Sequence, residues 1–190
     1  MAARINPLIK DDRPNEAEAV VEEYEGQLSS EGRTEWQQRV SWTYFLTGDD
    51  AGARRLGAKA QAGTGEWAAQ ADWVVGLAAW RQHDYKAAAE NFASAARRSS
   101  DPEMLAAANF WAARAAMTNG QPDKVDSFLK AASRQTETFY GLLALQRLGL
   151  KAMPPAPASS ATVEARPNVR AALALAEIGE RKLADQLFRH

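Results

Sequence analysis

The chain contains no cysteine and only two histidines, His83 and His190. The absence of cysteine excludes disulfides, thiolate catalysis and cysteine-based zinc sites. The two histidines are far apart in the sequence, so neither has a second histidine at the short spacing that zinc sites use. We therefore expect no metal and no cofactor. We interpret His83 as an exposed turn residue rather than as the base of a catalytic triad.

Long apolar runs and an excess of either charge are also missing. No apolar run approaches the roughly 18 residues that a membrane span needs, so we expect no membrane span. The 23 Lys and Arg residues nearly balance the 24 Asp and Glu residues, which gives a formal net charge of −1. A nucleic-acid-binding protein needs a basic face to neutralise phosphates. We therefore expect no nucleic-acid partner.

Three groups of residues resemble functional motifs but favour simpler interpretations. The segment Gly63-Thr64-Gly65 is followed by Glu66-Trp67, and it therefore lacks the lysine and the hydroxyl of a phosphate-binding loop. The pairs Arg54-Arg55 and Arg97-Arg98 have acids nearby and are interpreted as solvated helix faces. An acidic cluster near the start is likewise interpreted as a solvated helix face rather than as paired catalytic carboxylates. Its members are Glu16, Glu18, Glu22, Glu23 and Glu25.

The residues that are present favour helices. Alanine is abundant while Ile, Thr and Val are sparse, and alanine loses no side-chain entropy in a helix. No proline occurs between Pro14 and Pro102, and no segment shows the period-two alternation of a strand. We predict helices at 14–28, 33–46, 50–62, 65–82, 85–98, 102–118, 122–133, 136–148, 167–178 and 180–189.

Small and aromatic residues recur at a regular interval along these helices. In the best copy, Ala88, Phe92 and Ala95 share one helix face because their spacing is i, i+4, i+7. Leu56, Phe92 and Leu129 occupy equivalent positions 36 and 37 residues apart, slightly more than the roughly 34 residues of a tetratricopeptide repeat. The sequence therefore predicts an all-α fold, a right-handed superhelix of stacked antiparallel helical hairpins that resembles the tetratricopeptide solenoid.

We divide the chain into three parts. Residues 1–152 form the helical-repeat superhelical domain, and residues 153–167 form an insert rich in Pro, Ala and Ser. Residues 168–190 form a further helical hairpin of the same superhelix. The last part contains a degenerate copy of the repeat at Leu175, Gly179, Ala184 and Phe188.

All six tryptophans lie on predicted helices, namely Trp36, Trp42, Trp67, Trp73, Trp80 and Trp111. Exposed rings could stack on sugars, but we favour the simpler interpretation that the rings pack between helices. Two pairs, Trp80 with Arg81 and Trp111 with Arg114, could meet a sugar and a carboxylate together on a concave face. These four residues are the candidate glycan contacts.

Two segments resemble soluble lytic murein transglycosylases. The first is Asn109-Phe110-Trp111-Ala112-Ala113-Arg114-Ala115, and the second begins at Thr138-Phe139-Tyr140-Gly141 and ends at Leu148-Gly149. In that family an aromatic-rich helical hairpin precedes a Thr-Phe-Tyr-Gly segment and a Leu-Gly stop. The resemblance spans roughly 33–189 and is most specific over 107–149. We take Thr138, Phe139, Tyr140 and Gly141 as the family-signature segment.

The resemblance implies a bacterial, periplasmic protein that acts on the cell wall. Members of the family cleave the MurNAc–GlcNAc bond of peptidoglycan and leave a 1,6-anhydro product. They join an α-superhelical region to a lysozyme-like catalytic domain with Glu-Ser and Gly-Leu-Met-Gln motifs. Neither motif occurs in this chain, which thus resembles the superhelical region alone. We therefore assign no catalytic residue and expect that the chain does not cleave glycan by itself.

Two functional hypotheses follow. In the first, the chain is the superhelical scaffold of a periplasmic lytic transglycosylase, and its partners are peptidoglycan strands and a catalytic domain not in this chain. In the alternative, it is a stand-alone tetratricopeptide-like module for protein–protein interaction, and cytoplasmic, since residues 1–7 lack the apolar core of a secretory signal. Such a groove should be lined by Lys, Arg and Asn, where the sequence offers Asp72, Gly76 and Ala112. We favour the first hypothesis.

Overall fold

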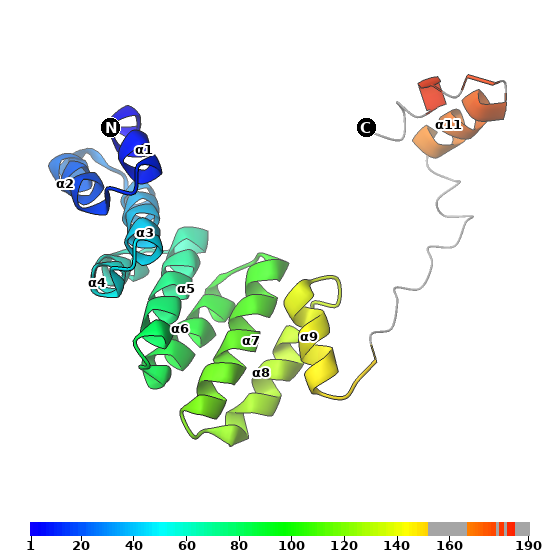
Figure 1. Cartoon of the computed structure of the whole chain (residues 1–190). Helices are drawn as coiled ribbons and strands as arrows, with labels where there is room; N and C mark the ends of the chain where they lie inside the picture. Colours follow the sequence, from blue (N-terminus) through cyan, green and yellow to red (C-terminus); the bar gives the residue numbers. More distant parts are fainter. Residues whose placement is uncertain (152–166, 178, 181, 185–190) are drawn as a thin grey trace. The chain divides into compact units, whose positions relative to one another are not determined.

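The computed structural model describes residues 1–151, 167–177, 179–180 and 182–184. It divides the chain into two units, Met1–Ala152 and Met153–His190. All regular elements in the described part are helices, and neighbouring helices pack in chain order (Figure 1). This confirms the predicted all-α, solenoid-like class. None of the helices in this part is both long and apolar enough to cross a membrane.

The first unit holds nine α-helices and two 3-10 helices among the described residues. In chain order they are α1 (Ala2–Lys10), α2 (Pro14–Tyr24), η1 (Glu25–Gln27), α3 (Ser30–Leu46), α4 (Asp50–Gln61), α5 (Gly65–Arg81), α6 (Tyr85–Arg98), α7 (Pro102–Thr118), η2 (Pro122–Lys124), α8 (Val125–Ala132) and α9 (Phe139–Arg147). The second unit contains α11 (Pro167–Glu177). The predicted insert 153–167 lies outside the described residues apart from Pro167. Of the predicted helix 180–189, only residues 180 and 182–184 are described.

Helix α1 corrects the sequence analysis, which places no helix before residue 14. Pro7 lies inside α1, and a proline in a helix interior normally costs a hydrogen bond. The helix forms because its apolar side packs on the core: Ile5 is fully buried, and Leu8 and Ile9 pack against the same cluster. The spacing of these three residues was the available signal, but Pro7 obscured it.

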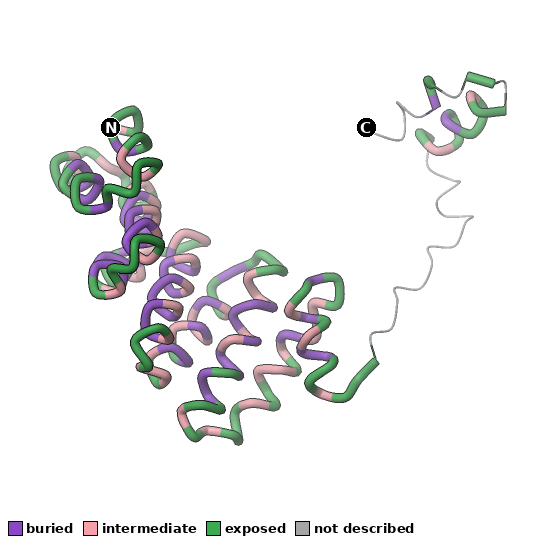
Figure 2. The backbone as a smooth tube through the Cα atoms, viewed as in Figure 1, coloured by how far each residue is buried: buried purple, intermediate pink, exposed green. Residues whose placement is uncertain are grey.

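Successive helices of the first unit form hairpins, with α3 against α4, α5 against α6 and α7 against α8 (Figure 1). The first helices of neighbouring hairpins also touch, since α1 contacts α3, α3 contacts α5, and α7 contacts α9. Close backbone approaches between α5 and α7 are few, and large aromatic side chains span the space between them. The buried residues lie mainly on the facing sides of the helices (Figure 2). The helices α1, α3, α5, α7 and α9 thus follow one another as one layer.

Small residues let neighbouring helices approach closely. A Cβ atom on Gly76 of α5 would lie only 2.7 Å from the ring of Phe92 on α6, which is fully buried. A Cβ atom on Gly57 of α4 would lie 2.5 Å from Val75 Cγ2 on α5. Glycines therefore allow close packing both within a hairpin, at Gly76 against Phe92, and between neighbouring hairpins, at Gly57 against Val75.

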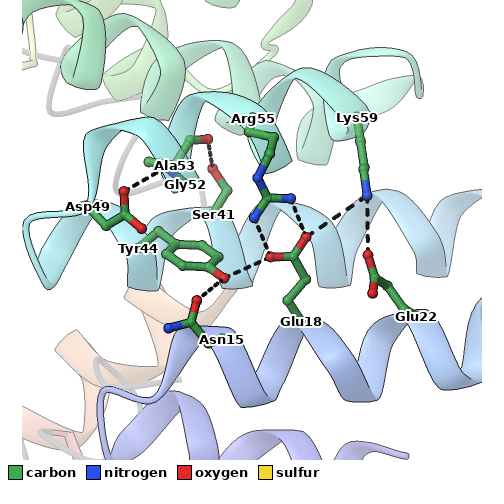
Figure 3. Close-up of polar contacts among 10 residues, drawn as sticks. All are labelled: Asn15, Glu18, Glu22, Ser41, Tyr44, Asp49, Gly52, Ala53, Arg55 and Lys59. Atoms are coloured by element: carbon green, nitrogen blue, oxygen red, sulfur yellow. Dashed lines mark hydrogen bonds and ion pairs between the residues drawn. The ribbon is translucent and has the colours of Figure 1, made fainter.

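A network of charged and polar side chains joins α2 to α3 and α4 (Figure 3). The carboxylate of Glu18 accepts hydrogen bonds of 2.5 and 2.6 Å from Arg55 and one of 2.8 Å from the hydroxyl of Tyr44. These bonds, those from Arg55 above all, lower the pKa of Glu18, while burial raises the pKa of Tyr44 to about 12. Glu18 is buried, so its interpretation as part of a solvated face is wrong. Its partners come from other helices, which the local acidic pattern does not reveal.

A second buried carboxylate joins α4, α5 and α6. The oxygens of Asp72 accept hydrogen bonds of 2.7 Å from the Gln61 amide and 2.7 Å from the Ser94 hydroxyl, and Arg98 lies 3.5 Å away. Burial raises the pKa of Asp72 against the effect of these partners. Asp72 is therefore a component of the packed interior and not of a groove surface.

Candidate functional site

The family-signature segment forms the start of α9. The Thr138 hydroxyl accepts a hydrogen bond of 3.0 Å from the Gly141 N–H and donates one of 2.8 Å to the Gln135 carbonyl. A Cβ atom on Gly141 would lie 1.9 Å from that same carbonyl oxygen, so only glycine fits. Tyr140 packs on Phe110 with ring centroids 5.4 Å apart, whereas Phe139 is 64% exposed. The segment fixes where α9 begins and how it lies against α7.

Helix α9 lines a cavity of about 1030 Å³ together with α5, α7 and α8. We call it the arginine pocket and define it by Trp80, Arg114, Gln146 and Arg147. Sequence reasoning missed Gln146 and Arg147. The signal was their spacing from Leu143, another lining residue, at i+3 and i+4, which places all three on one face of α9.

Two of the four predicted glycan contacts, Trp80 and Arg114, line this pocket, and a third, Trp111, lies behind them in contact with Arg114. The guanidinium carbon of Arg114 lies 4.4 Å from the ring centre of Trp111 and 5.2 Å from that of Trp80. The two tryptophan rings meet edge to face, with centroids 5.4 Å apart. Within the described part of the chain, Trp111 Nε1 is buried without a hydrogen-bond partner, and neither Arg114 nor Arg147 forms an ion pair. Arg114 is exposed, so its positive charge faces solvent.

Arg81, the fourth predicted contact, lies elsewhere. Its Nε donates hydrogen bonds of 2.8 and 2.7 Å to the two carboxylate oxygens of Asp50, and its Nη2 donates one of 2.8 Å to the Phe45 carbonyl. It does not line the arginine pocket. Residues adjacent in a helix point in different directions, so the neighbour of Trp80 in sequence is not its neighbour in space. Arg81 as a glycan contact stays a prediction without support from this geometry.

A second cavity, of about 380 Å³, opens between α3 and α5 and reaches α1 and α7. We call it the amide pocket and define it by Gln38, Trp42, Trp67, Gln70 and Trp73. Sequence reasoning singled out the tryptophans but neither glutamine. The signal was again helical spacing, because Gln38 and Trp42 are four residues apart and Trp67 and Gln70 are three apart.

The tryptophans are partly packed and partly exposed. Trp36 is buried, and the other five are intermediate. Trp42 stacks on Phe45, and Trp73 tilts against Phe92. Contacts with other side chains thus cover part of several of the rings, and four of the tryptophans, Trp42, Trp67, Trp73 and Trp80, line the two pockets.

The two pockets suit binding by stacking, hydrogen bonds and positive charge. Of the described residues that line them, none is acidic, and both buried carboxylates, Glu18 and Asp72, are held in networks elsewhere. Across the described part of the chain, no three His, Asp or Glu side chains come together as a group that could hold a metal ion. Pairs of carboxylates for acid–base work are therefore not a feature of either cavity.

The fold places the chain in the class of all-α, solenoid-like repeat proteins. Comparison with models of known families, with curated proteins and with solved structures gives no significant match.

Proposed function

We propose that this chain is the superhelical scaffold region of a periplasmic peptidoglycan lytic transglycosylase. In this role it positions glycan strands, or limits their access, relative to a catalytic domain not in this chain. The observation that carries the proposal is the arginine pocket, where Trp80 and two arginines without an ion-pair partner in the described part face one cavity.

The chemistry of this pocket matches that of a peptidoglycan strand. Sugar rings have apolar faces that pack on aromatic side chains, and the lactyl carboxyl of muramic acid is joined by an amide bond to a peptide stem that carries free carboxylates. Arginine presents a fork of N–H donors that suits carboxylates. Arg114 on α7 and Arg147 on α9 come from different helices, so they can contact separate groups of one ligand. The signature residues Thr138 and Gly141 support the pocket by fixing the start of α9.

Sedimentation of the full chain with purified peptidoglycan sacculi tests this proposal. We expect the protein to sediment with sacculi and to release no 1,6-anhydro-muropeptides. The double variant Arg114→Gln, Arg147→Gln should lose most of this binding, and rising salt should weaken the wild type because exposed charges are screened. Arg97→Gln is the matched control, since Arg97 is an exposed arginine on α6 that lines neither pocket. Absence of sedimentation, or release of anhydro products by the pure chain, would contradict the proposal.

One observation favours the alternative of a cytoplasmic, tetratricopeptide-like module for protein–protein interaction. Phe139 and Leu142 on α9 are 64% and 45% exposed, and large exposed apolar side chains occur at protein-binding surfaces. A module of this kind would not sediment with sacculi. It would instead lose its partner when Phe139 and Leu142 are changed to serine, while the arginine variants would leave the partner bound.

A further inference from the structure

The amide pocket differs from the arginine pocket in carrying no free charge among the described residues. The one cation on its lining, Arg39, is already engaged. Its guanidinium lies 3.4 Å from Glu35 Oε1, donates a hydrogen bond of 3.1 Å to Asn6 Oδ1 and lies 4.4 Å from the ring centre of Trp36. The described lining of this pocket therefore presents no unpaired charge to a ligand.

Two side-chain amides of the pocket are available to a ligand. Gln38 on α3 is only 6% exposed, yet none of the hydrogen bonds found among the described residues involves its amide or that of Gln70 on α5. Neither amide is among the fully buried polar atoms without a partner in the described part of the chain, so both amides reach solvent and can form hydrogen bonds with a ligand. Each amide offers both N–H donors and a carbonyl acceptor.

The tryptophans of the pocket retain free ring surface. No ring or guanidinium in the described part of the chain stacks on Trp67, in contrast to Trp80, which Tyr85, Trp111 and Arg114 all contact. The volume of about 380 Å³ falls within the range of roughly 300–1,000 Å³ that small-ligand sites occupy. The pocket therefore has room for a flat apolar face beside two amides.

We infer that the amide pocket binds an N-acetylated amino sugar, with the sugar ring against Trp67 and its acetamido group hydrogen-bonded to Gln38 and Gln70. An acetamido group carries one N–H donor and one carbonyl acceptor without charge, and a glutamine amide complements both. The inference rests on the proposed function in one respect: it assigns the uncharged sugars of a glycan strand to this pocket and the carboxylates to the arginine pocket.

Titration of the full chain with a β-1,4-linked N-acetylglucosamine hexamer, followed by tryptophan fluorescence and calorimetry, tests the inference. The matched probe is the cellulose hexamer, in which a hydroxyl replaces each acetamido group. We expect the acetylated hexamer to bind at least about tenfold more tightly. A site with buried polar groups discriminates strongly against a ligand that cannot pair them.

Variants of Gln38 and Gln70 test whether the acetylated hexamer binds in the amide pocket. Gln70→Leu should weaken binding of the acetylated hexamer about tenfold, as the loss of one hydrogen bond to the ligand predicts, and Gln38→Leu should do the same. Gln70 is only half-buried, so its variant tests the site even where the Gln38 variant unfolds. Gln27→Leu is the matched control, because Gln27 is exposed on η1 and lines neither pocket.

Three results would overturn the inference: equal affinity for the two hexamers, unchanged affinity in Gln70→Leu, or no binding of the acetylated hexamer. Sedimentation with sacculi separates this failure from that of the proposed function. A chain that sediments with sacculi through Arg114 and Arg147 but ignores the hexamer refutes only the sugar assignment of the amide pocket. A chain that does neither refutes both.

Discussion

The amide pocket and the arginine pocket share the helices α5 and α7 but offer opposite chemistry. In the arginine pocket the guanidinium of Arg114 lies over the rings of Trp80 and Trp111. The rings are therefore partly covered, while the positive charge has no ion-pair partner in the described part of the chain. In the amide pocket the charge of Arg39 is paired with Glu35, and no ring or guanidinium of the described residues stacks on Trp67. The comparison shows that an aromatic residue beside an arginine in sequence does not by itself define a sugar site. We base the two proposed sites instead on the groups that lack a protein partner in the described part of the chain.

A continuous row of rings connects the two pockets. Trp73 of the amide pocket lies 5.2 Å from Phe92 between ring centroids, Phe92 lies 5.9 Å from Trp111, and Trp111 lies 5.4 Å from Trp80. These residues span the space between α5, α6 and α7, where α5 and α7 make few close backbone approaches. Both pockets therefore depend on one aromatic core, although each has its own polar groups.

The largest effect should come from the centre of this row. Phe92→Ala removes a fully buried ring and should lower the free energy of unfolding by about 3–5 kcal/mol. Because Phe92 contacts Trp73 and Trp111, the change should weaken ligand binding at both pockets. Urea unfolding measures the loss. Phe139→Ala, at a ring 64% exposed, is the control and should stay within about 0.5 kcal/mol of the wild type.

The next largest effect should come from Gly141→Ala, which should change ligand binding at the arginine pocket but not at the amide pocket. Gly141→Ala places a Cβ atom 1.9 Å from the Gln135 carbonyl, and relief of such a clash requires α9 to move. We expect a loss of about 3 kcal/mol, at the upper end of overpacking costs. Displacement of α9 should abolish binding at the arginine pocket and spare the amide pocket, which no residue of α9 lines. Equal loss at both pockets would show that they are not independent.

A pH titration should change the stability that comes from the network around Glu18, which lines neither pocket. The pKa of Glu18 is lowered by Arg55, so its contribution to stability is complete well above its ordinary value of 4.5 and is lost as the pH falls through the lowered pKa. Glu18→Gln should cost about 2 kcal/mol at neutral pH. The difference in unfolding free energy between the wild type and this variant should shrink below pH 4.5. A difference that stays constant between pH 7 and pH 3 would contradict the assigned ion pair.

The smallest effect concerns the turn after α5. His83 has a φ of 62°, in the left-handed region, where the corresponding turns hold Gly48 and Gly120. Removal of the side chain relieves backbone strain of about 1 kcal/mol, so His83→Gly should raise the melting temperature slightly. Its ring contacts Tyr85, which contacts Trp80, so any change in binding should be confined to the arginine pocket. A fall in melting temperature would show that the His83–Tyr85 hydrogen bond outweighs the strain.

The sequence predicted the fold well because the repeat is a local pattern. The predicted starts at 50, 65, 85, 102 and 167 match the observed helices, whereas α3 begins at Ser30 rather than at 33 and α9 at Phe139 rather than at 136. Helix α1 was not predicted because Pro7 argues against a helix. The helix is stabilised by the burial of Ile5, a tertiary effect that the local sequence does not reveal.

The site was predicted only in part. Trp80 and Arg114, which line the arginine pocket, were singled out because their residue types stand out. Gln38, Gln70 and Arg147 were missed because each lines a cavity whose other walls come from distant helices. The ion pair of Glu18 was missed for the same reason, since Arg55 is contributed by α4. Spacing within a helix shows which residues share a face but not which faces meet.

The central claim is that the two pockets on α5 and α7 bind one glycan strand. The most direct measurement is a nuclear magnetic resonance titration of the full chain with soluble peptidoglycan tetrasaccharide, following the indole N–H signals of the six tryptophans. The account predicts shifts for Trp67, Trp73 and Trp80 and none for Trp36, which lines neither pocket. If no indole signal moves at millimolar ligand, or if Trp36 moves as far as the others, the claim is contradicted.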